Sequence, residues 1–339
     1  VLCCTGRQKS RLYLSRGDTV MNNDMIDFNT NAMRLIPLFS RSDELQYTDY
    51  GLKCDKVDTI YGKFLFPDIT ALSRSFTYGS FVISIDGKIA FEDDEVGPLI
   101  AKNNYMDING GVTDFWILNL LRASCDAIII GSGTLRKEPS YSGRIHDADL
   151  LAARIENNKS VTPVTVIVSR TGRNIPYQHQ IFHSDEIPLI INVSPVGLKT
   201  LVKEIPFSYT VITEDMGKEL LDKNSLSNAD KKIIILVTGQ NMETDDNALL
   251  LILKQFGIDR ALIESPTYCQ QLMKDKLLDE IFINTSCIFA GGTAGSFGKE
   301  KRLFTSTEHP HAEIVSMHLH SPYFYYTRYK LAYCNDKSS

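Results

Sequence analysis

Runs of apolar, β-branched residues alternate with polar, glycine-containing segments along most of the chain. Runs of this length and composition, bounded by turn residues, predict strands. Because the runs are continuously apolar rather than alternating, they favour a sheet that is covered on both faces. The predicted strands lie at 80–90, 126–131, 163–168, 187–193, 208–213, 232–238, 260–264 and 279–284. The pattern therefore predicts an α/β fold with a mostly parallel sheet flanked by helices.

Helical spacing of apolar residues predicts three helices between these strands. The segment VTDFWILNLLRAS, in which Thr113 or Asp114 is suited to cap the helix, runs directly into the strand at 126–131. Further helices are expected at about 244–256 and 267–274. Two alternating runs, EIVSMHLHS and YFYYTRYKLAY, flank Ser321-Pro322 and predict a terminal antiparallel hairpin.

The strength of the pattern also suggests how the chain is divided. Residues 1–20 carry no clear apolar period, and the chain opens with Val, so we expect a disordered or non-native leader before a natural start at Met21 or Met25. Residues 21–74 contain few strong periods and are expected to wrap the main domain. That domain is predicted at 75–334.

Composition and charge exclude several classes of protein. With 339 residues, 43% hydrophobic and 23% charged, the chain is expected to be globular. Its net charge of −5 argues against a broad basic surface for nucleic acid, so an anionic ligand must be held by a few placed cations. No apolar run reaches the ~20 residues that cross a bilayer, and no secretory signal is evident, so we expect a cytoplasmic protein with no membrane partner.

The cysteines and histidines predict no metal site. The seven cysteines are scattered and never spaced C-x-x-C, which suits a reducing compartment, and Cys125 and Cys287 are interpreted as small buried apolar residues. His318 and His320 alternate along a strand without an evident acidic partner. The motifs of P-loop proteins, serine hydrolases, zinc proteases, kinases and zinc deaminases are also missing.

A glycine turn follows the strand at 126–131 and is the most informative candidate site. It reads G131-S-G-T-L-R136, which lacks the last glycine of the dinucleotide fingerprint. Glycines here let a phosphate approach the backbone, and N–H groups at a following helix start hold its charge. A tight structural turn explains the same residues.

A second strand-to-helix junction runs from Glu264 to Tyr268. It places a carboxylate at the C-terminal end of a strand, where ligands gather in open α/β sheets. The structural alternative is a simple cap, with Ser265 as N-cap and Pro266 at the first helical position.

Two charged residues have a functional and a structural interpretation. Arg122 ends an apolar helix beside the same edge, where it either clamps a phosphate or stabilises the helix C-terminus. Asp86 stands in a D-G turn and is either a catalytic residue or a turn residue.

Five segments in succession are similar to the motifs of the bacterial riboflavin-biosynthesis pyrimidine reductases. They are SFVISIDGKIA, LLRASCDAIIIGSGTLRKEPSY, PVTVIVSRTG, GIDRALIESPT and LLDEIFINTSCIFAGG, within about 75–332. The resemblance implies a dihydrofolate-reductase-like fold and a homodimer. It also implies NADPH-dependent reduction of 5-amino-6-(5-phosphoribosylamino)uracil, a phosphorylated pyrimidine, to its ribitylamino product.

The resemblance also assigns roles by position. Substrate contacts fall on Ser84, Arg122, Arg144 and Glu264, with Arg122 at the phosphate, and catalytic roles on Asp86 and Glu264. Asp86, Glu264 or an ordered water is the candidate proton donor, and Arg136 or Arg170 is suited to the 2′-phosphate of NADPH. Contacts to NADPH fall on Val82, Gly131, Ser132, Thr134, Glu138, Ser169, Ser265, Pro266, Thr267 and Tyr268.

Two departures from the family pattern keep other functions open. Ser265-Pro266 stands where the family commonly has two glycines, and Ser80 stands where many relatives carry Lys or Asn. One alternative is a reductase of the same fold that acts on another pteridine, pyrimidine or carbonyl substrate. The other is a non-catalytic nucleotide-binding protein.

Overall fold

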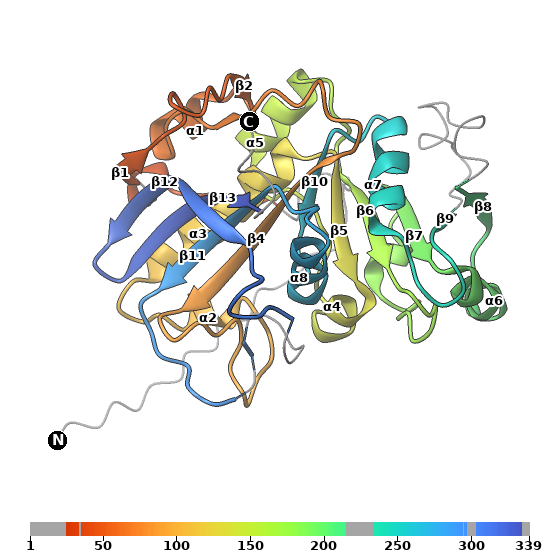
Figure 1. Cartoon of the computed structure of the whole chain (residues 1–339). Helices are drawn as coiled ribbons and strands as arrows, with labels where there is room; N and C mark the ends of the chain where they lie inside the picture. The colour runs from red at the N-terminus through yellow and green to blue at the C-terminus, as the bar shows by residue number, and fades with distance from the viewer. Residues whose placement is uncertain (1–24, 34, 215–232, 294, 297–302, 334–339) are drawn as a thin grey trace, which may run out of the picture.

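An eleven-stranded sheet forms the centre of the molecule, as the computed structural model in Figure 1 shows. The structure describes residues 25–33, 35–214, 233–293, 295–296 and 303–333, so the predicted leader 1–20 lies outside the described residues. The strands of this sheet are β1 (Ile36–Ser40), β4 (Phe76–Ser84), β5 (Ala127–Gly131), β6 (Val164–Val168), β7 (Leu189–Val193), β8 (Tyr209–Thr213), β9 (Ile233–Val237), β10 (Arg260–Ile263), β11 (Glu280–Ser286), β12 (His311–Ser321) and β13 (Phe324–Ala332).

The sheet is parallel over most of its width. Its order is β1-β12-β13-β11-β4-β10-β5-β6-β7-β9-β8, and every pair from β11 to β8 is parallel. The hairpin of β12 and β13 and the edge strand β1 pair antiparallel. A separate small sheet joins β2 (Asp49–Tyr50) to β3 (Leu65–Phe66). The predicted fold class, a mostly parallel α/β sheet with an antiparallel C-terminal hairpin, is confirmed.

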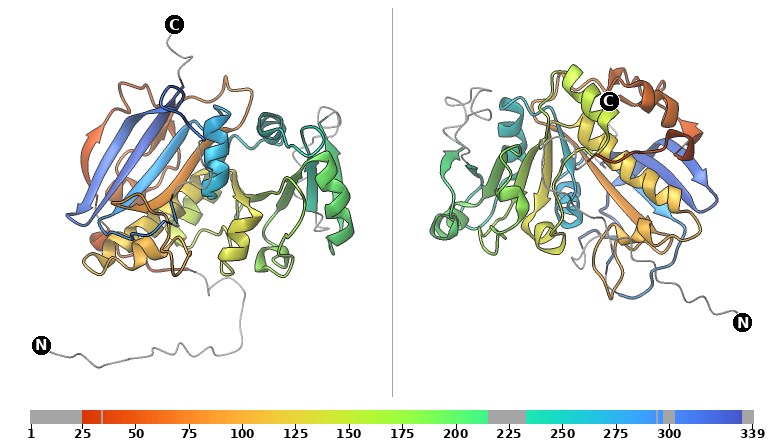
Figure 2. Two further views of the ribbon diagram at one scale, coloured as in Figure 1. Left: turned by 60° about the horizontal axis from the view of Figure 1, so that its bottom comes forward. Right: turned by 180° about the vertical axis from the view of Figure 1, so that it is seen from behind.

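Helices cover both faces of the sheet (Figures 1 and 2). The helices are η1 (Thr30–Ala32), α1 (Asp55–Ile60), α2 (Leu99–Lys102), α3 (Ile108–Ser124), α4 (Ser132–Lys137), α5 (Ala148–Glu156), η2 (Gln180–Phe182), α6 (Pro195–Glu204), α7 (Asp246–Gln255) and α8 (Pro266–Lys274). Side chains alternate between the two faces along β5: Ile128 and Ile130 pack in the core with α3 and α5, whereas Ala127 and Ile129 pack in the core with α7 and α8.

Helix α3 begins earlier than the sequence predicts. Asp107 accepts from the backbone N–H of Gly110 and caps the helix, so the predicted cap at Thr113 or Asp114 is wrong. The first turn contains Gly110 and Gly111, which are poor helix formers. A Cβ at Gly111 would stand 2.8 Å from the carbonyl oxygen of Ala101. Close packing of the α2 segment against this turn therefore requires glycine and overrides propensity.

Strand β4 begins at Phe76, earlier than the strand predicted within 80–90, and it ends just before the predicted D-G turn. It ends at Ser84, because the next residues turn back and the Gly87 N–H donates to the Ser84 carbonyl at 3.0 Å. Gly87 has a φ of 73°, a left-handed conformation that glycine adopts without strain.

The segment before residue 75 is integrated with the sheet. It supplies the edge strand β1, and Val57, Ile60 and Phe64 are buried in the main core. The Tyr47 hydroxyl donates to Glu280 of β11 at 2.6 Å, and Glu280 is also paired with the buried Arg328 of β13. The division at 74/75 stays a prediction. Among the described residues, no helix has both the length and the apolar character that a bilayer crossing demands.

Candidate active site

A cavity of about 1170 Å³ opens along the C-terminal edge of the parallel strands. Val82 of β4, Gly131 of β5, Val168 of β6 and Glu264, directly after β10, line it. This is the edge at which ligands bind in open α/β sheets.

Most of the residues predicted to bind cofactor or substrate line this one cavity. Arg122 and Glu264 of the predicted substrate set do so, whereas Ser84, Asp86 and Arg144 are not among its lining residues. The complete predicted cofactor set lines it: Val82, Gly131, Ser132, Thr134, Glu138, Ser169, Ser265, Pro266, Thr267 and Tyr268.

The two strand-to-helix junctions stand side by side. Strands β5 and β10 are parallel neighbours, and a Cβ on Gly131 would lie 3.1 Å from the Ser265 hydroxyl oxygen. Gly131 is the N-cap of α4, and Ser265 is the N-cap of α8, with Pro266 in the first turn. The Ser265 side chain makes no cap hydrogen bond. A side chain at position 131 would thus fill the space between the junctions.

Arg122 and Glu264 bind each other. The Arg122 Nε and Nη2 donate to the two oxygens of Glu264 at 2.8 and 2.7 Å, and the side chains are only 6% and 8% exposed. The Arg122 Nη1 donates to the Arg144 carbonyl at 3.1 Å, and the guanidinium lies 5.5 Å from the centre of the Tyr141 ring. Contacts with described residues use three of the five N–H donors of the guanidinium, which leaves two for a ligand.

Asp86 connects two loops. Its carboxylate accepts from the Ser84 hydroxyl at 2.6 Å and from the backbone N–H groups of Ala290 and Gly291 at 3.1 and 2.8 Å. The Ser84 hydrogen bond, followed by these N–H groups, lowers the pKa of Asp86 to about 2. Asp86 is therefore ionised at neutral pH, and this geometry favours the turn interpretation.

The Arg144 guanidinium is engaged near η2. Its Nη2 lies 3.2 Å from the Ser184 hydroxyl and 3.0 Å from a carboxylate oxygen of Glu186. The part of Arg144 that touches the site is its carbonyl, through Arg122.

Comparison with known proteins places this architecture in a family. The family model of the RibD C-terminal domain matches residues 78–317. The chain belongs to the RibD C-terminal domain family. The predicted resemblance is confirmed, and the matched residues include β5, β6, β10 and all of β4 except its first two residues.

Three proteins that resemble this chain share 15–25% of its residues. A protein of Archaeoglobus fulgidus named 2,5-diamino-6-ribosylamino-4(3H)-pyrimidinone 5′-phosphate reductase is 25% identical over 221 residues, 65% of this chain and 83% of the relative. RibD of Acinetobacter baumannii superposes with a TM-score of 0.51 at 15% identity, over 82% of this chain and 63% of RibD. A pyrimidine reductase-like protein of Corynebacterium diphtheriae gives a TM-score of 0.51 at 17% identity, over 81% and 98%. The two structures share the fold.

Two carboxyl groups with raised pKa values line the cavity, but the sequence suggested no catalytic or binding role for either of them. Burial raises the pKa of Asp114 to about 7 and that of Asp246 to about 6. The Tyr268 hydroxyl donates to Asp246 at 3.1 Å. Asp114 stands four residues before Leu118 and eight before Arg122, so its place on the Arg122 face of α3 was a signal available in the sequence.

Cations also collect at the cavity, although the chain is negative overall. Arg170 pairs with Glu243 at 3.0 Å, and Arg136 donates to the Asn174 carbonyl at 2.8 Å. The basic residues that line the cavity are Lys102, Arg122, Arg136, Lys137, Arg170, Arg173 and Lys274. Acidic residues line the cavity as well, namely Glu95, Asp114, Glu138, Glu243, Asp246, Glu264 and Asp275. An anionic ligand would therefore be held by individual cations and not by a uniformly positive wall.

The histidines have structural partners. His318 is buried against Tyr61, with ring centres 4.3 Å apart, and burial lowers its pKa to about 4. The expectation that His320 lacks an acidic partner is wrong, because its Nδ1 lies 2.9 Å from Asp107. Cys125 is buried as predicted, and Cys287 is half-buried. Within the described residues, no group of three or more His, Cys, Asp or Glu is arranged to hold a metal ion.

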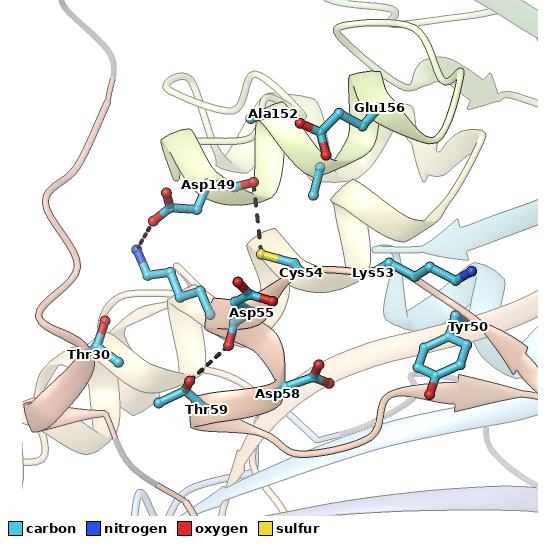
Figure 3. Close-up of a pocket in the computed structure, with 12 residues that line it drawn as sticks. Thr30, Tyr50, Lys53, Cys54, Asp55, Asp58, Thr59, Asp149, Ala152 and Glu156 are labelled. Carbon is cyan, nitrogen blue, oxygen red and sulfur yellow. Dashed lines mark hydrogen bonds and ion pairs between the residues drawn. The ribbon is translucent and has the colours of Figure 1, made fainter.

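A second pocket, of about 810 Å³, lies between α1 and α5 (Figure 3). Lys56 of α1 pairs there with Asp149 at 3.0 Å, and the Cys54 thiol donates to the Asp149 carbonyl at 4.0 Å. None of the predicted site residues lines this pocket. These contacts join α1 to α5.

Proposed function

We propose that this chain is a reductase of riboflavin biosynthesis that reduces the ribosyl carbon C1′ of a 5-amino-6-(5-phosphoribosylamino)pyrimidine. The proposal rests on one cavity at the sheet edge, which is lined by residues from separate sequence segments: Val82, Arg122, Gly131, Ser169 and Glu264. Membership of the RibD C-terminal domain family supports the reaction class.

NADPH is the proposed reductant, and it supplies the hydride when bound. The residues present fit a dinucleotide, because Gly131 leaves open a space that a Cβ would fill. The backbone of 131–134 and 265–268 would approach the phosphates, and Arg136 or Arg170 would meet the 2′-phosphate. With no hydride donor among amino-acid side chains, the protein's task is to orient two ligands and exclude water.

On the substrate side, we propose that the Arg122–Glu264 pair meets the phosphoribosyl group. Two N–H groups of Arg122 remain for the phosphate, and the pairing with Glu264 fixes the plane of the guanidinium. Arg144 supports this arrangement through its carbonyl. Ser84 and Asp86 shape the site by holding the loop at 290–291.

The proposal also includes the identity of the pyrimidine substrate, a homodimeric assembly and a cytoplasmic location. Our expected substrate is the uracil, whereas the Archaeoglobus relative is named for the 2,5-diamino-pyrimidinone, so both belong in the assay. A homodimer is supported by edge strand β1, where Ile36, Leu38 and Phe39 are 51%, 55% and 45% exposed. The four described cysteines are free thiols, which supports a reducing cytoplasm.

The direct test follows NADPH absorbance after adding each phosphorylated pyrimidine. We expect oxidation that depends on both enzyme and pyrimidine, and slower oxidation of NADH. NADPH binding without consumption with either pyrimidine would instead support the non-catalytic alternative. Consumption with a different pteridine or carbonyl compound alone would support another reductase of this fold.

A further inference from the structure

Helix α3 presents a carboxyl group to the cavity two turns before Arg122. Asp114, Leu118 and Arg122 follow one another at intervals of four residues, and all three line the cavity. This spacing places them on one face of the helix. Because the helix begins at Ile108 and is capped by Asp107, the Asp114 carboxyl is not needed at the helix end.

A buried amide fixes one oxygen of this carboxyl group. The Asn284 Nδ2 donates to the Asp114 Oδ1 at 2.7 Å. Asn284 is only 2% exposed and lies on β11 opposite Val82 of β4, which also lines the cavity. Sheet register therefore holds Asn284 in place, and Asn284 orients the Asp114 carboxyl.

Most of the charged and titratable groups on the surrounding elements have partners other than Asp114. On β13, the Tyr326 hydroxyl donates to the Gly110 carbonyl at 2.8 Å, and on α3 itself Asp107 lies 2.9 Å from His320 of β12. Arg122 is bound to Glu264, as described above, and the loop residue Glu95 pairs with Lys137 of α4. Lys102 of α2 lines the cavity, but no ion pair between described residues joins it, or any other cation, to Asp114.

An unpaired, half-buried carboxyl group tends to keep its proton. Burial raises the pKa of Asp114 to about 7, and the Asn284 hydrogen bond opposes part of this rise. A carboxylic acid that is still protonated near neutral pH and faces a ligand cavity is suited to general acid catalysis.

The proposed reaction requires such an acid. Hydride adds to C1′ of the ribosyl group, the C1′–O4′ bond breaks, and its electron pair remains on the ring oxygen, which must take a proton. NADPH is oxidised to NADP⁺ and the sugar is reduced to the open ribityl chain. Neither side chain named from the sequence is ready to give this proton, because Asp86 is ionised and outside the cavity wall, and both Glu264 oxygens accept from Arg122.

We propose that Asp114 is the acid that protonates the ribose ring oxygen as its bond to C1′ breaks, and that Asn284 is its positioning residue. The inference rests on the reductase function proposed above. The two other cavity carboxyls with raised pKa values belong to the proposed cofactor segments: Asp246 accepts from Tyr268, and Glu138 follows the 131–136 turn.

The first test compares wild type with Asp114→Asn, which removes the proton and keeps the shape. We expect kcat with NADPH and the pyrimidine to fall by about 100-fold or more. The decline of wild-type kcat/KM above about pH 7 disappears in the variant, while the NADPH dissociation constant stays the same. Asp58→Asn, the same change at an exposed carboxylate on α1, is the control and keeps wild-type kinetics.

A second variant separates catalysis from structure. Asn284→Ala removes a hydrogen bond that lowers the Asp114 pKa, so the decline of kcat/KM moves to higher pH. A carbon NMR titration of the free enzyme, assigned with Asp114→Asn, reports the same group without turnover, and we expect its midpoint near 7.

The outcomes are distinct. If wild type oxidises no NADPH with either pyrimidine, the proposed reductase function is wrong, and the role proposed for Asp114 is wrong as well. If wild type is active but Asp114→Asn keeps its kcat and pH profile, only the role of Asp114 is wrong. A carboxyl titration centred near pH 4, or an Asn284→Ala profile that does not move, also overturns it.

Discussion

At the scale of single residues, Arg122 and Glu264 form a buried ion pair with two hydrogen bonds. Arg122 and Glu264 were both expected at the substrate, yet they lie 142 positions apart, and only the sheet brings them into contact. The bidentate pair changes what a mutation does. Removing one partner of a buried ion pair leaves the other charge unpaired, which is costlier than losing a surface pair.

Arg122→Ala is therefore expected to act on both stability and substrate binding. The loss of the partner of Glu264 lowers the free energy of unfolding by about 3–5 kcal/mol, measured by urea denaturation. KM rises strongly for phosphorylated but not for dephosphorylated substrate, NADPH affinity barely changes, and Arg122→Lys recovers part of the loss. The control is Arg170→Ala, which breaks an ion pair whose side chains are 59% and 72% exposed and costs about 0–1 kcal/mol. If KM rises equally for the phosphorylated and the dephosphorylated substrate, the role of Arg122 is structural.

At the scale of elements, apolar runs predicted most of the strands and α7 and α8 closely, because buried parallel strands are defined by their own composition. The features that the sequence did not predict depend on contacts with residues that are distant in the chain. The α3 start is set by Ala101 packing on Gly111, and strand β1 forms on the hairpin strand β12 although all its residues are exposed. Asp114 was interpreted as a cap for the same reason: its place in the helix depended on where the helix begins.

Helix propensity alone would predict the wrong effect for a substitution at Gly111, where α3 contacts the α2 segment. Ala is the better helix former by about 1 kcal/mol, but at position 111 its Cβ would stand 2.8 Å from a backbone oxygen. We expect Gly111→Ala to destabilise the protein by about 1–3 kcal/mol in urea denaturation. Asn109→Ala, at an exposed position in the same turn, changes stability by no more than about 0.5 kcal/mol. Stabilisation by Gly111→Ala would show that the contact relaxes.

At the scale of the whole molecule, the parallel sheet explains why separate motifs form one site. Five segments spread over about 200 residues were recognised in order, and parallel pairing carries the C-terminal ends of β4, β5, β6 and β10 to one edge. Direction along the chain therefore predicts which residues meet. It does not predict that Arg144 and Asp86 are absent from the lining of the cavity, because their positions depend on loop geometry.

Ligand binding at this edge is expected to stabilise the whole fold. A ligand that binds only the native state raises the midpoint of thermal unfolding. We expect millimolar NADPH to raise it by several degrees, and NADH to raise it less because it lacks the 2′-phosphate. The comparison of Arg136→Ala with Arg170→Ala identifies the residue that meets this phosphate, because the responsible variant loses the difference between the two cofactors. If NADPH leaves the midpoint of thermal unfolding unchanged, the proposal that NADPH is the cofactor is wrong.

We propose that hydride passes in this cavity from NADPH to C1′ of a phosphoribosylaminopyrimidine. An assay with NADPH that carries deuterium on both positions of C4, followed by mass spectrometry and proton NMR of the product, tests this transfer. We expect a ribitylamino product with one deuterium, bound to C1′. Unlabelled product, or deuterium on the pyrimidine ring or on another carbon, would contradict it.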